Sequence, residues 1–378
     1  MLFCSPGFDD HEEVIFLCDP SVRLKAIIAI HSTLRGPAIG GCRIKRYDDE
    51  QAALGDVLKL ARAMTYKSAV CGLPFGGGKA VIIADPKQEK SPRLLRSFAH
   101  RLNLLRGRYQ TADDMGSTVM DMELMREITP YARGIPTAEG LPCPATAYGV
   151  FCSIKAGLSF HHGADDDIAG YSVAIQGVGS VGRKLCEYLV EEGTKVFVSD
   201  TDPTTLQSVV EAFGVTPVAV EDIHRLEVDV FSPCATGAVI HEQNVHELGA
   251  TIVAGAANNQ LSSHRCSEAL RRRGILYAPD FVANAGGLID LAREGPDYSV
   301  QSVLEQTATI HDRVLAIFEE SARTGRTTHD IAMDMATERL QGPPSATAIR
   351  HPADERAHRD RTNQEDAQCH QEGSPSIS

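Results

Sequence analysis

The architecture of this 378-residue chain follows from one segment, Val173-Ala174-Ile175-Gln176-Gly177-Val178-Gly179-Ser180-Val181-Gly182. An apolar strand pattern leads into glycines spaced Gly-x-Gly-x-x-Gly, and a helical pattern covers 179–192. In such a unit Gly177 permits a tight turn, Gly179 lets the backbone approach a pyrophosphate, and Gly182 permits close helix–strand contact. The segment therefore predicts a dinucleotide-binding unit of the Rossmann type.

Asp200 supports this interpretation, because it follows the next predicted strand, 195–198, and lies 18 residues after Gly182. A carboxylate there suits ribose hydroxyls and repels a 2′-phosphate, so NAD is favoured over NADP. The alternative is a strand–helix turn that binds no ligand. Since helix N-termini bind phosphates, the residues predicted to contact the cofactor are Gly177, Val178, Gly179, Ser180, Val181 and Gly182.

The hydrophobic pattern divides the chain into two α/β regions. Residues 1–140 are predicted to form a mixed α/β substrate domain, with strands at 24–30, 81–83 and 109–112, a helix at 50–66 capped by Asp48 and Gln51, and a helix from Ser91-Pro92. Residues 145–330 are predicted to form an NAD-binding domain with a parallel, doubly wound sheet, with strands at 173–175, 195–198, 228–231, 251–253 and 275–277 and a helix from Pro203.

Segments rich in Pro, Gly or polar residues separate or follow these regions. The stretch 134–144 reads as a linker. An amphipathic helix is expected at 303–323, and residues 331–350 are expected to pack back on the protein. The polar stretch 351–378 has little to bury and is predicted to be a disordered tail.

Composition excludes several classes of function. The net charge of −13 argues against a nucleic-acid partner, which usually leaves a basic footprint. The N-terminus has no signal-peptide pattern, and the aliphatic run 24–30 is too short to span a membrane. Ten cysteines without a Cys-x-x-Cys pair indicate reduced thiols, a cytoplasmic location and no metal site.

Two lysines lie where a solvated side chain is unexpected. Lys67 ends a predicted helix whose apolar face continues into Ser68-Ala69-Val70, and Lys79 lies between Gly76-Gly77-Gly78 and a buried strand. Burial and a neighbouring cation both lower the pKa of a lysine, which makes it a candidate base or electrophile. Because single lysines are usually surface residues, the pair taken alone leaves both interpretations open.

Other polar residues follow predicted strands. Asp114 ends the strand 109–112 and is equally explained as the cap of a helix starting near Ser117. Asn258-Asn259 and Asn284-Ala285-Gly286-Gly287 also come after predicted strands, where a Rossmann sheet presents residues to its ligand, although adjacent asparagines are common in turns.

The order of these motifs carries more information than any one of them. It comprises 36–41 (Gly-Pro-Ala-Ile-Gly-Gly), 64–67, 76–79, 111–114, 177–182, 233–235, 254–260 and 279–287. In this order the chain resembles the amino acid dehydrogenase superfamily, in its leucine/valine/phenylalanine dehydrogenase branch. The resemblance covers residues 10–341.

The resemblance implies roles for individual residues. Lys67 would anchor the substrate carboxylate, Lys79 would polarise the carbonyl and activate water, and Asp114 would carry the proton to and from the amine. Asn259, or its neighbour Asn258, would face the substrate and the nicotinamide, and Thr146 would approach the carboxamide. The implied reaction is the reversible NAD-dependent deamination of an L-amino acid by a homo-oligomer, with the active site in a cleft between the domains.

The resemblance also bears on the substrate, whose predicted contacts include Gly40, Ala112 and Val282. Glutamate-specific relatives carry a lysine where this chain has Ile39, so an apolar pocket is implied, since a buried unpaired carboxylate is costly. Ile39 resembles the branched-chain enzymes, whereas Phe281-Val282-Ala283 resembles some phenylalanine enzymes. Leucine, valine or isoleucine is the expected substrate, and phenylalanine is the alternative.

Two other functional classes fit the sequence less well. A 2-hydroxy-acid dehydrogenase would need a His/carboxylate pair with an arginine, and would leave both lysines without a role. A non-catalytic NAD-binding protein would tolerate the loss of Lys79 or Asp114, yet both are present.

Overall fold

The computed structural model describes residues 2–5, 7–134, 144–163, 167–295 and 297–342. These residues belong to one compact unit, Met1–Pro343. The predicted tail 351–378, most of the predicted linker and residues 343–350 lie outside the described residues. Within them no helix is long and apolar enough to cross a membrane.

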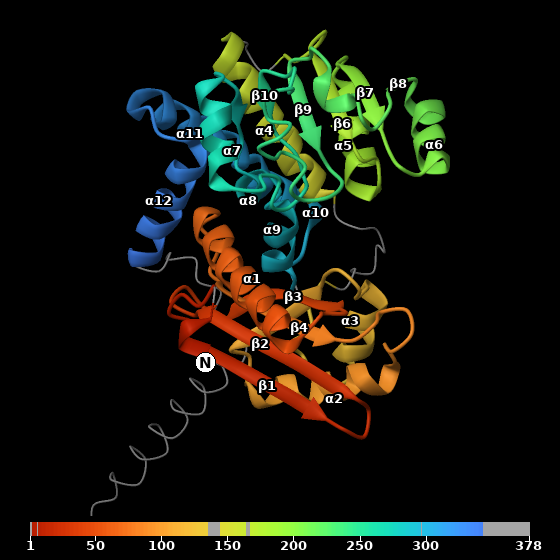
Figure 1. Cartoon of the computed structure of the whole chain (residues 1–378), viewed down its shortest axis with the longest axis vertical. Coiled ribbons are helices and arrows are strands. Elements are labelled where there is room, and N and C mark those ends of the chain that lie inside the picture. The colour runs from red at the N-terminus through yellow and green to blue at the C-terminus, as the bar shows by residue number, and fades with distance from the viewer. Residues whose placement is uncertain (1, 6, 135–143, 164–166, 296, 343–378) are drawn as a thin grey trace, which may run out of the picture. The chain divides into compact units, whose positions relative to one another are not determined.

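The predicted Rossmann-type sheet is present (Figure 1). Six parallel strands run in the order β11-β10-β9-β6-β7-β8. They are β6 (Ser172–Gln176), β7 (Lys195–Ser199), β8 (Thr216–Pro217), β9 (Val230–Pro233), β10 (Ile252–Val253) and β11 (Leu276–Tyr277). The strand predicted at 228–231 begins two residues later, and those predicted at 251–253 and 275–277 begin one residue later and are one residue shorter. The order reverses at the neighbours β6 and β9, where such folds bind their ligands.

Helices surround this sheet and continue to the end of the described chain. They are α4 (Ala145–His162), α5 (Ser180–Glu191), α6 (Pro203–Phe213), η2 (Ile223–Arg225), α7 (His264–Arg272), α8 (Asp280–Ala283), α9 (Gly286–Arg293), α10 (Val300–Ala308), α11 (Ile310–Thr324) and α12 (Thr328–Gln341). Two predictions were wrong here. The single helix expected at 303–323 is two helices separated at Thr309, and a helix, α8, precedes Asn284 in place of a strand.

The other sheet is mixed and has the order β1-β2-β4-β3-β5. Its strands are β1 (Glu13–Asp19), β2 (Leu24–Ser32), β3 (Ala38–Lys45), β4 (Gly76–Ile83) and β5 (Tyr109–Asp113), and its helices are η1 (Leu2–Cys4), α1 (Glu50–Val70), α2 (Pro92–Leu104) and α3 (Val119–Arg126). Strand β2 is antiparallel to β1 and β4, and β3 is parallel to β4 and β5.

Strand β2 explains why a strand of the mixed sheet could be predicted from a continuous apolar run. Ile27 packs with the apolar face of α1, and Ile28 packs with residues of α2 on the opposite face. A strand covered on both faces carries a continuous apolar run instead of an alternating one. The predicted strand 24–30 is confirmed, as is the cap of α2, where the Ser91 hydroxyl accepts the Leu94 N–H.

The glycines before Lys79 and Lys79 itself lie in a strand, which corrects the prediction that this strand covers only 81–83. Gly76 to Lys79 form the first half of β4. A Cβ on Gly77 would lie 2.0 Å from the Thr65 nitrogen of α1, and one on Gly76 would lie 1.9 Å from the Ser32 oxygen. Bare backbone is therefore needed because α1 and β2 approach β4 closely. Ile39 and Gly40 belong to β3, a strand that the sequence analysis did not predict.

Helix α1 differs from its prediction at both ends. It continues to Val70, so that Lys67 lies inside its last turn, and its N-cap is Asp49 rather than Asp48. Asp49 accepts the Ala52 N–H at 2.7 Å. The alternative role of Asp114 as a helix cap was also wrong, because α3 is capped by Thr118 in a capping box with Asp121.

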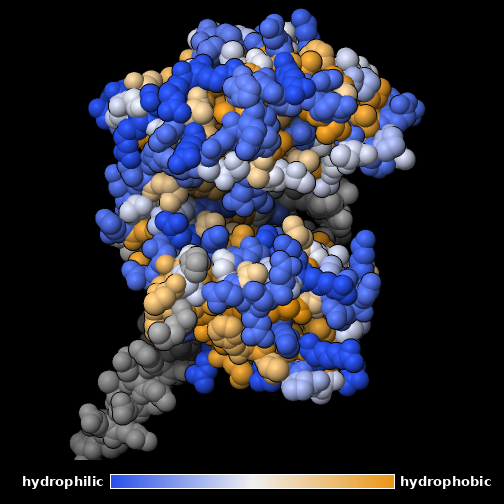
Figure 2. All heavy atoms as spheres, in the orientation of Figure 1, coloured by the Kyte–Doolittle hydropathy of each residue, from blue (hydrophilic) through white to orange (hydrophobic). Residues whose placement is uncertain are grey.

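Strand β1 is an edge of the mixed sheet and was not predicted. Its outer edge has no strand partner among the described residues, and the Phe16 side chain is 59% exposed. Figure 2 shows hydrophobic residues gathered on the surface around β1 and β2, low in the view. An open edge with apolar side chains is typical of a surface that pairs with another chain.

A half-buried histidine pair under α1 leads to a prediction about stability. His31 Nδ1 lies 2.9 Å from the Thr65 hydroxyl oxygen, and the His11 and His31 rings are 4.8 Å apart. Burial, helped by the charge that His11 would carry, lowers the pKa of His31 to about 4. Between pH 6.5 and pH 4 the unfolded chain therefore binds a proton that the folded chain does not, and stability falls as the pH falls.

We expect this group to lower the free energy of unfolding by about 3 kcal/mol between pH 7 and pH 4. Urea unfolding of the wild type and of His31→Gln across this range measures the difference. The wild type should lose more stability than His31→Gln, and His100→Gln, at an exposed position of α2, should follow the wild type. Parallel curves for the wild type and His31→Gln would contradict this account.

Candidate active site

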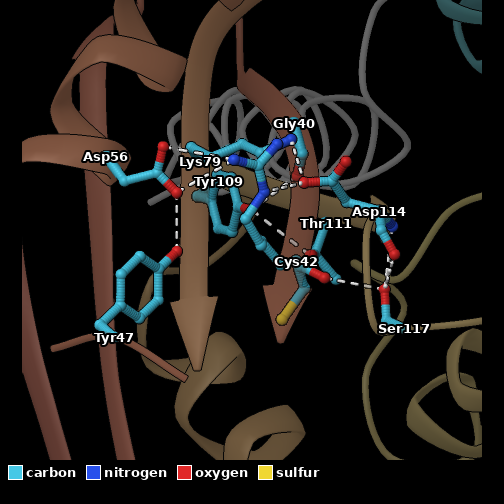
Figure 3. Close-up of polar contacts among 10 residues, drawn as sticks. Gly40, Cys42, Tyr47, Asp56, Lys79, Tyr109, Thr111, Asp114 and Ser117 are labelled. Carbon is cyan, nitrogen blue, oxygen red and sulfur yellow. Dashed lines mark hydrogen bonds and ion pairs between the residues drawn. The ribbon is translucent and has the colours of Figure 1, made fainter. Parts of the chain in front are cut away.

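Lys79 and Asp114 form an ion pair across the mixed sheet. Lys79, on β4, is 6% exposed, and its Nζ lies 3.0 Å from Oδ2 of Asp114, which follows β5 (Figure 3). Strand β3 runs between β4 and β5. Gly41 of β3 allows the approach, because a Cβ there would lie 2.8 Å from the Asp114 Cβ. The structure thus brings the two predicted catalytic residues together.

The ionisation of Asp114 is set by opposing effects. Burial raises the pKa of its carboxyl group, but the charges of Lys79 and Arg43 outweigh burial, so that the pKa lies below its ordinary value. Asp114 is therefore a carboxylate held against two cations. A carboxylate of this kind is ionised at rest and can accept a proton from an ammonium group that is placed beside it.

Arg43 was missed by the sequence analysis. Its Nε lies 3.0 Å from Asp114 Oδ2, and its Nη1 lies 3.2 and 3.0 Å from the two oxygens of Asp56 on α1. The Tyr47 hydroxyl donates to Asp56 Oδ2 at 2.7 Å. No local pattern distinguishes Arg43, because its partners are 13 and 71 residues away along the chain.

Lys67 joins the mixed sheet to the Rossmann-type region. Its Nζ donates to Oδ1 of Asn284 at 2.6 Å. Asn284 in turn donates to the Ala256 oxygen at 3.0 Å and to Oδ1 of Asn258 at 2.7 Å. Burial is the main cause that lowers the pKa of Lys67 to about 8, and the charge of Lys79 acts in the same direction. Lys67 is thus a desolvated cation whose contact is a neutral amide.

The two adjacent asparagines are placed differently. Asn258 reaches Lys67 through Asn284, whereas Asn259 has a φ of 52° and its backbone oxygen accepts the Ala238 N–H at 2.6 Å. In the sequence, Asn284 belongs to a motif expected to follow a strand. Its hydrogen bond with Lys67 could not be predicted, because the two residues are 217 positions apart in the chain.

The glycine loop after β6 fits a dinucleotide. Gly177 has a φ of 92°, and a Cβ on Gly182 would lie 2.0 Å from the Gly177 oxygen, so both positions require glycine. A Cβ on Gly179 would meet nothing within 4 Å, and no side chain caps the start of α5. The loop therefore leaves room beside helix N–H groups, the arrangement that binds a pyrophosphate.

Asp200 lies at this loop, at the end of β7. Its Oδ2 accepts the Val178 N–H at 2.8 Å, and its Oδ1 accepts the Asp202 N–H at 2.9 Å. The carboxylate therefore supports the glycine loop. Because an ionised carboxylate has about four acceptor sites, it can still bind hydroxyl groups.

The remaining predicted residues lie on the strands and helix ends around these groups. Ile39 and Val282 are fully buried and belong to the same cluster of packed apolar side chains. Ala112 is paired with Gly41 in the β3–β5 register and is also buried. Thr146 lies next to Gly287: a Cβ added to Gly287 would lie 2.9 Å from the Thr146 hydroxyl oxygen. Among the residues that the structure describes, no group of His, Cys, Asp and Glu side chains could hold a metal ion.

Comparison with known proteins identifies this arrangement. Residues 12–131 match the Glu/Leu/Phe/Val dehydrogenase dimerisation domain, and residues 200–324 match the Glutamate/Leucine/Phenylalanine/Valine dehydrogenase domain. Leucine dehydrogenase of Bacillus subtilis (strain 168) is 42% identical over 335 residues, which cover 88% of this chain and 92% of the relative. The chain belongs to the Glu/Leu/Phe/Val dehydrogenase family.

Other members of the family with different names are equally similar. Phenylalanine dehydrogenase of Bacillus thermotolerans is 42% identical over 343 residues, covering 88% of this chain and 89% of the relative. The crystal structure of L-tryptophan dehydrogenase from Nostoc punctiforme has a TM-score of 0.78 and 42% identity, and the match covers 88% of this chain and 96% of that one. The predicted family, two-part α/β fold and enzyme class are confirmed.

The protein is therefore an NAD(P)-dependent amino acid dehydrogenase, an oxidoreductase that acts on CH–NH₂ donors. The choice among apolar amino acids does not follow from the family, since relatives of nearly the same identity carry the names of leucine and phenylalanine enzymes.

Proposed function

We propose that this family member catalyses the reversible, NAD-dependent oxidative deamination of an apolar L-amino acid, of the leucine, valine or isoleucine type, to its 2-oxo acid and ammonia. The pairing of buried Lys79 with Asp114 carries this proposal. It combines a fixed cation with a carboxylate able to take a proton from an amine, which are the two groups that deamination requires.

Each charged residue has a separate role in this proposal. Lys67, desolvated and in contact only with neutral amides in its described hydrogen bonds, binds the substrate carboxylate. Asp114 removes a proton from the substrate ammonium, because hydride can leave Cα only once the amine is neutral. Lys79 stabilises the oxygen that forms when water adds to the imine carbon, and Asp114 returns a proton to the departing ammonia.

The cofactor would be held by residues 177–182, Asp200, Thr146 and Asn258, and it supplies the acceptor for the hydride. The overall balance is zwitterionic amino acid, water and NAD⁺ giving 2-oxo carboxylate, ammonium, NADH and one proton. Asn259 is proposed to face the substrate, with Gly40 and Ala112 along β3 and β5.

The side-chain pocket is proposed to be apolar. Ile39 replaces the lysine that would pair a distal carboxylate, and both Ile39 and Val282 are 0% exposed within one apolar cluster. A glutamate side chain would bury an unpaired charge there, which is costly. Phenylalanine is the alternative substrate, supported by the small residue in Phe281-Val282-Ala283 and by the phenylalanine dehydrogenase relative.

A substrate panel tests this function. kcat/KM would be measured with NAD for leucine, valine, isoleucine, phenylalanine, tryptophan and glutamate, and for the matching 2-oxo acids with ammonia and NADH. One methylene in an apolar pocket changes kcat/KM by about 10- to 200-fold, so the branched-chain substrates should overlap but differ. Glutamate as the best substrate would contradict the apolar pocket, and phenylalanine would favour the alternative.

Asp200 is proposed to select NAD over NADP. Asp200→Asn keeps an acceptor oxygen for the Val178 N–H but removes the charge that repels a 2′-phosphate, so the ratio of kcat/KM for NAD to that for NADP should fall by about 10-fold. Glu211→Gln, at an exposed position of α6, should leave the ratio unchanged. A wild-type enzyme that prefers NADP would rule out this role.

We propose further that the chain forms a homo-oligomer. The family model that matches residues 12–131 is described as a dimerisation domain, and the open edge of β1 lies within that range. Light scattering of the purified protein determines the subunit number. A monomer at micromolar concentration would contradict the proposal.

A further inference from the structure

Asp114 contacts two cations through the same oxygen. Lys79 Nζ and Arg43 Nε are each 3.0 Å from Oδ2. The two cations reach this atom from different strands, Lys79 from β4 and Arg43 from β3. Because both cations contact Oδ2, together they fix the orientation of the carboxylate and therefore the direction of its other oxygen, Oδ1.

The Arg43 guanidinium has a second carboxylate partner, Asp56, in addition to Asp114. Both oxygens of Asp56 accept from Arg43 Nη1, and Tyr47 donates to Asp56 Oδ2. The contacts therefore run from Tyr47 through Asp56 and the guanidinium of Arg43 to Asp114. Because Asp56 lies on α1 and Asp114 follows β5, the guanidinium joins the helix that carries Lys67 to the loop that carries the proton carrier.

We propose that Arg43 is a positioning residue for the proton transfer at Asp114: it fixes Oδ2, and thereby directs Oδ1 toward the substrate amine. This inference rests on the role proposed above for Asp114. Arg43 touches neither substrate nor cofactor in the proposed reaction and acts through the carboxylate alone.

The chemistry of the side chain supports an arginine at this position. A guanidinium remains charged throughout turnover and presents several N–H groups in a rigid plane, so that it can bind Asp56 and Asp114 together. The burial that lowers the pKa of Arg43 is outweighed by the charges of Asp114 and Asp56. An ammonium is a single compact charge and cannot reproduce this two-sided contact.

Other groups around Asp114 do not take over this role. The titratable and charged side chains that act on it or on its partners include Cys42 and Arg43 from β3, Lys79 from β4, Tyr109 and Asp113 from β5, Asp56 and Lys67 from α1, and Tyr47. The proposed function assigns Lys79 to the reacting oxygen of the substrate and Lys67 to its carboxylate. Arg43 is the remaining cation of this set, and its described contacts are with Asp114 and Asp56.

Arg43→Met tests the proposal through steady-state kinetics. We expect kcat to fall by about 10- to 100-fold, as for a misplaced catalytic group, while KM for the 2-oxo acid and Kd for NADH stay within about twofold. The solvent deuterium isotope effect on kcat should rise, and the isotope effect with 2-deuterated amino acid should fall, because proton transfer becomes slower than hydride transfer.

Further variants separate positioning from a structural role. Arg43→Lys should recover part of kcat, since it restores the charge without the two-sided contact. Asp56→Asn should lower kcat in the same direction but less, with the same isotope pattern. Arg46→Met removes an exposed guanidinium three residues further along, which contacts Asp85, and should behave as wild type. If Arg43→Met does not fold, as judged by circular dichroism, the Arg43→Lys and Asp56→Asn variants carry the test.

The possible failures are distinct. Near wild-type turnover in Asp114→Asn would overturn the role of Asp114 and with it the proposed function. An inactive Asp114→Asn together with a normal Arg43→Met would overturn this inference alone. The inference would also be overturned if the Arg43 variants lost kcat with unchanged isotope effects while KM rose by a similar factor.

Discussion

Lys79→Ala should reduce kcat by about 1,000-fold, whereas Kd for NADH should stay within about twofold of wild type. Lys79 is 6% exposed and 3.0 Å from Asp114 Oδ2, so its charge acts in a desolvated site, where it stabilises a developing oxyanion far more than it would in water. The NADH contacts proposed at residues 177–182 lie on another sheet, so cofactor binding should be preserved.

The measurement combines stopped-flow turnover with fluorescence titration of NADH. Lys79→Met should give the same loss as Lys79→Ala, which excludes an effect of the cavity left by alanine. Lys87→Ala, at an exposed position after β4, is the matched control and should retain full activity. Turnover near that of wild type in Lys79→Ala would show that the proposed mechanism is wrong.

Lys67→Met should chiefly weaken substrate binding. Loss of a charge-assisted hydrogen bond costs about 1.5–3 kcal/mol, which corresponds to a rise of about 10- to 150-fold in KM for the 2-oxo acid. kcat should change much less, because the carboxylate is bound equally in the ground state and in the transition state. The Lys67 contact with Asn284 implies that a substrate carboxylate replaces or joins a neutral amide as the partner of the ammonium.

Initial rates over a range of 2-oxo acid concentrations, at saturating ammonia and NADH, separate KM from kcat. Lys59→Ala, two turns earlier on the exposed side of α1, removes a charge from the same helix and should leave KM unchanged. A Lys67→Met enzyme with normal KM and strongly reduced kcat would exchange the roles proposed for the two lysines.

Where sequence reasoning succeeded, its determinants were local. The turn, the close approach and the helix start at Gly177 to Gly182 each depend on a glycine at a fixed spacing. The parallel sheet around them was predicted with five of its six strands, and β8 was missed. The cap at Ser91 likewise depends on a contact between residues three positions apart. Local geometry of this kind can be predicted from a short stretch of sequence, without knowledge of the rest of the chain.

The glycines before Lys79 show where prediction from local sequence fails. Three glycines in succession predict a turn, because glycine usually weakens a strand, yet Gly76 to Gly78 lie inside β4. The reason is the close approach of Thr65 and Ser32, which come from elements distant in the sequence. Packing between elements, and not the local preference of the chain, placed these residues.

By itself, then, the sequence determined the dinucleotide unit, the apolar strands that are buried on both faces and, by resemblance, the family, and it predicted Lys67, Lys79 and Asp114 as site residues. Tertiary structure alone decided which of these groups lie in contact. Asp114, Lys79 and Arg43 meet because β5, β4 and β3 are neighbours in a sheet whose order differs from the chain order. Lys67 meets Asn284 across 217 residues for the same reason, since such contacts depend on topology and leave no local pattern.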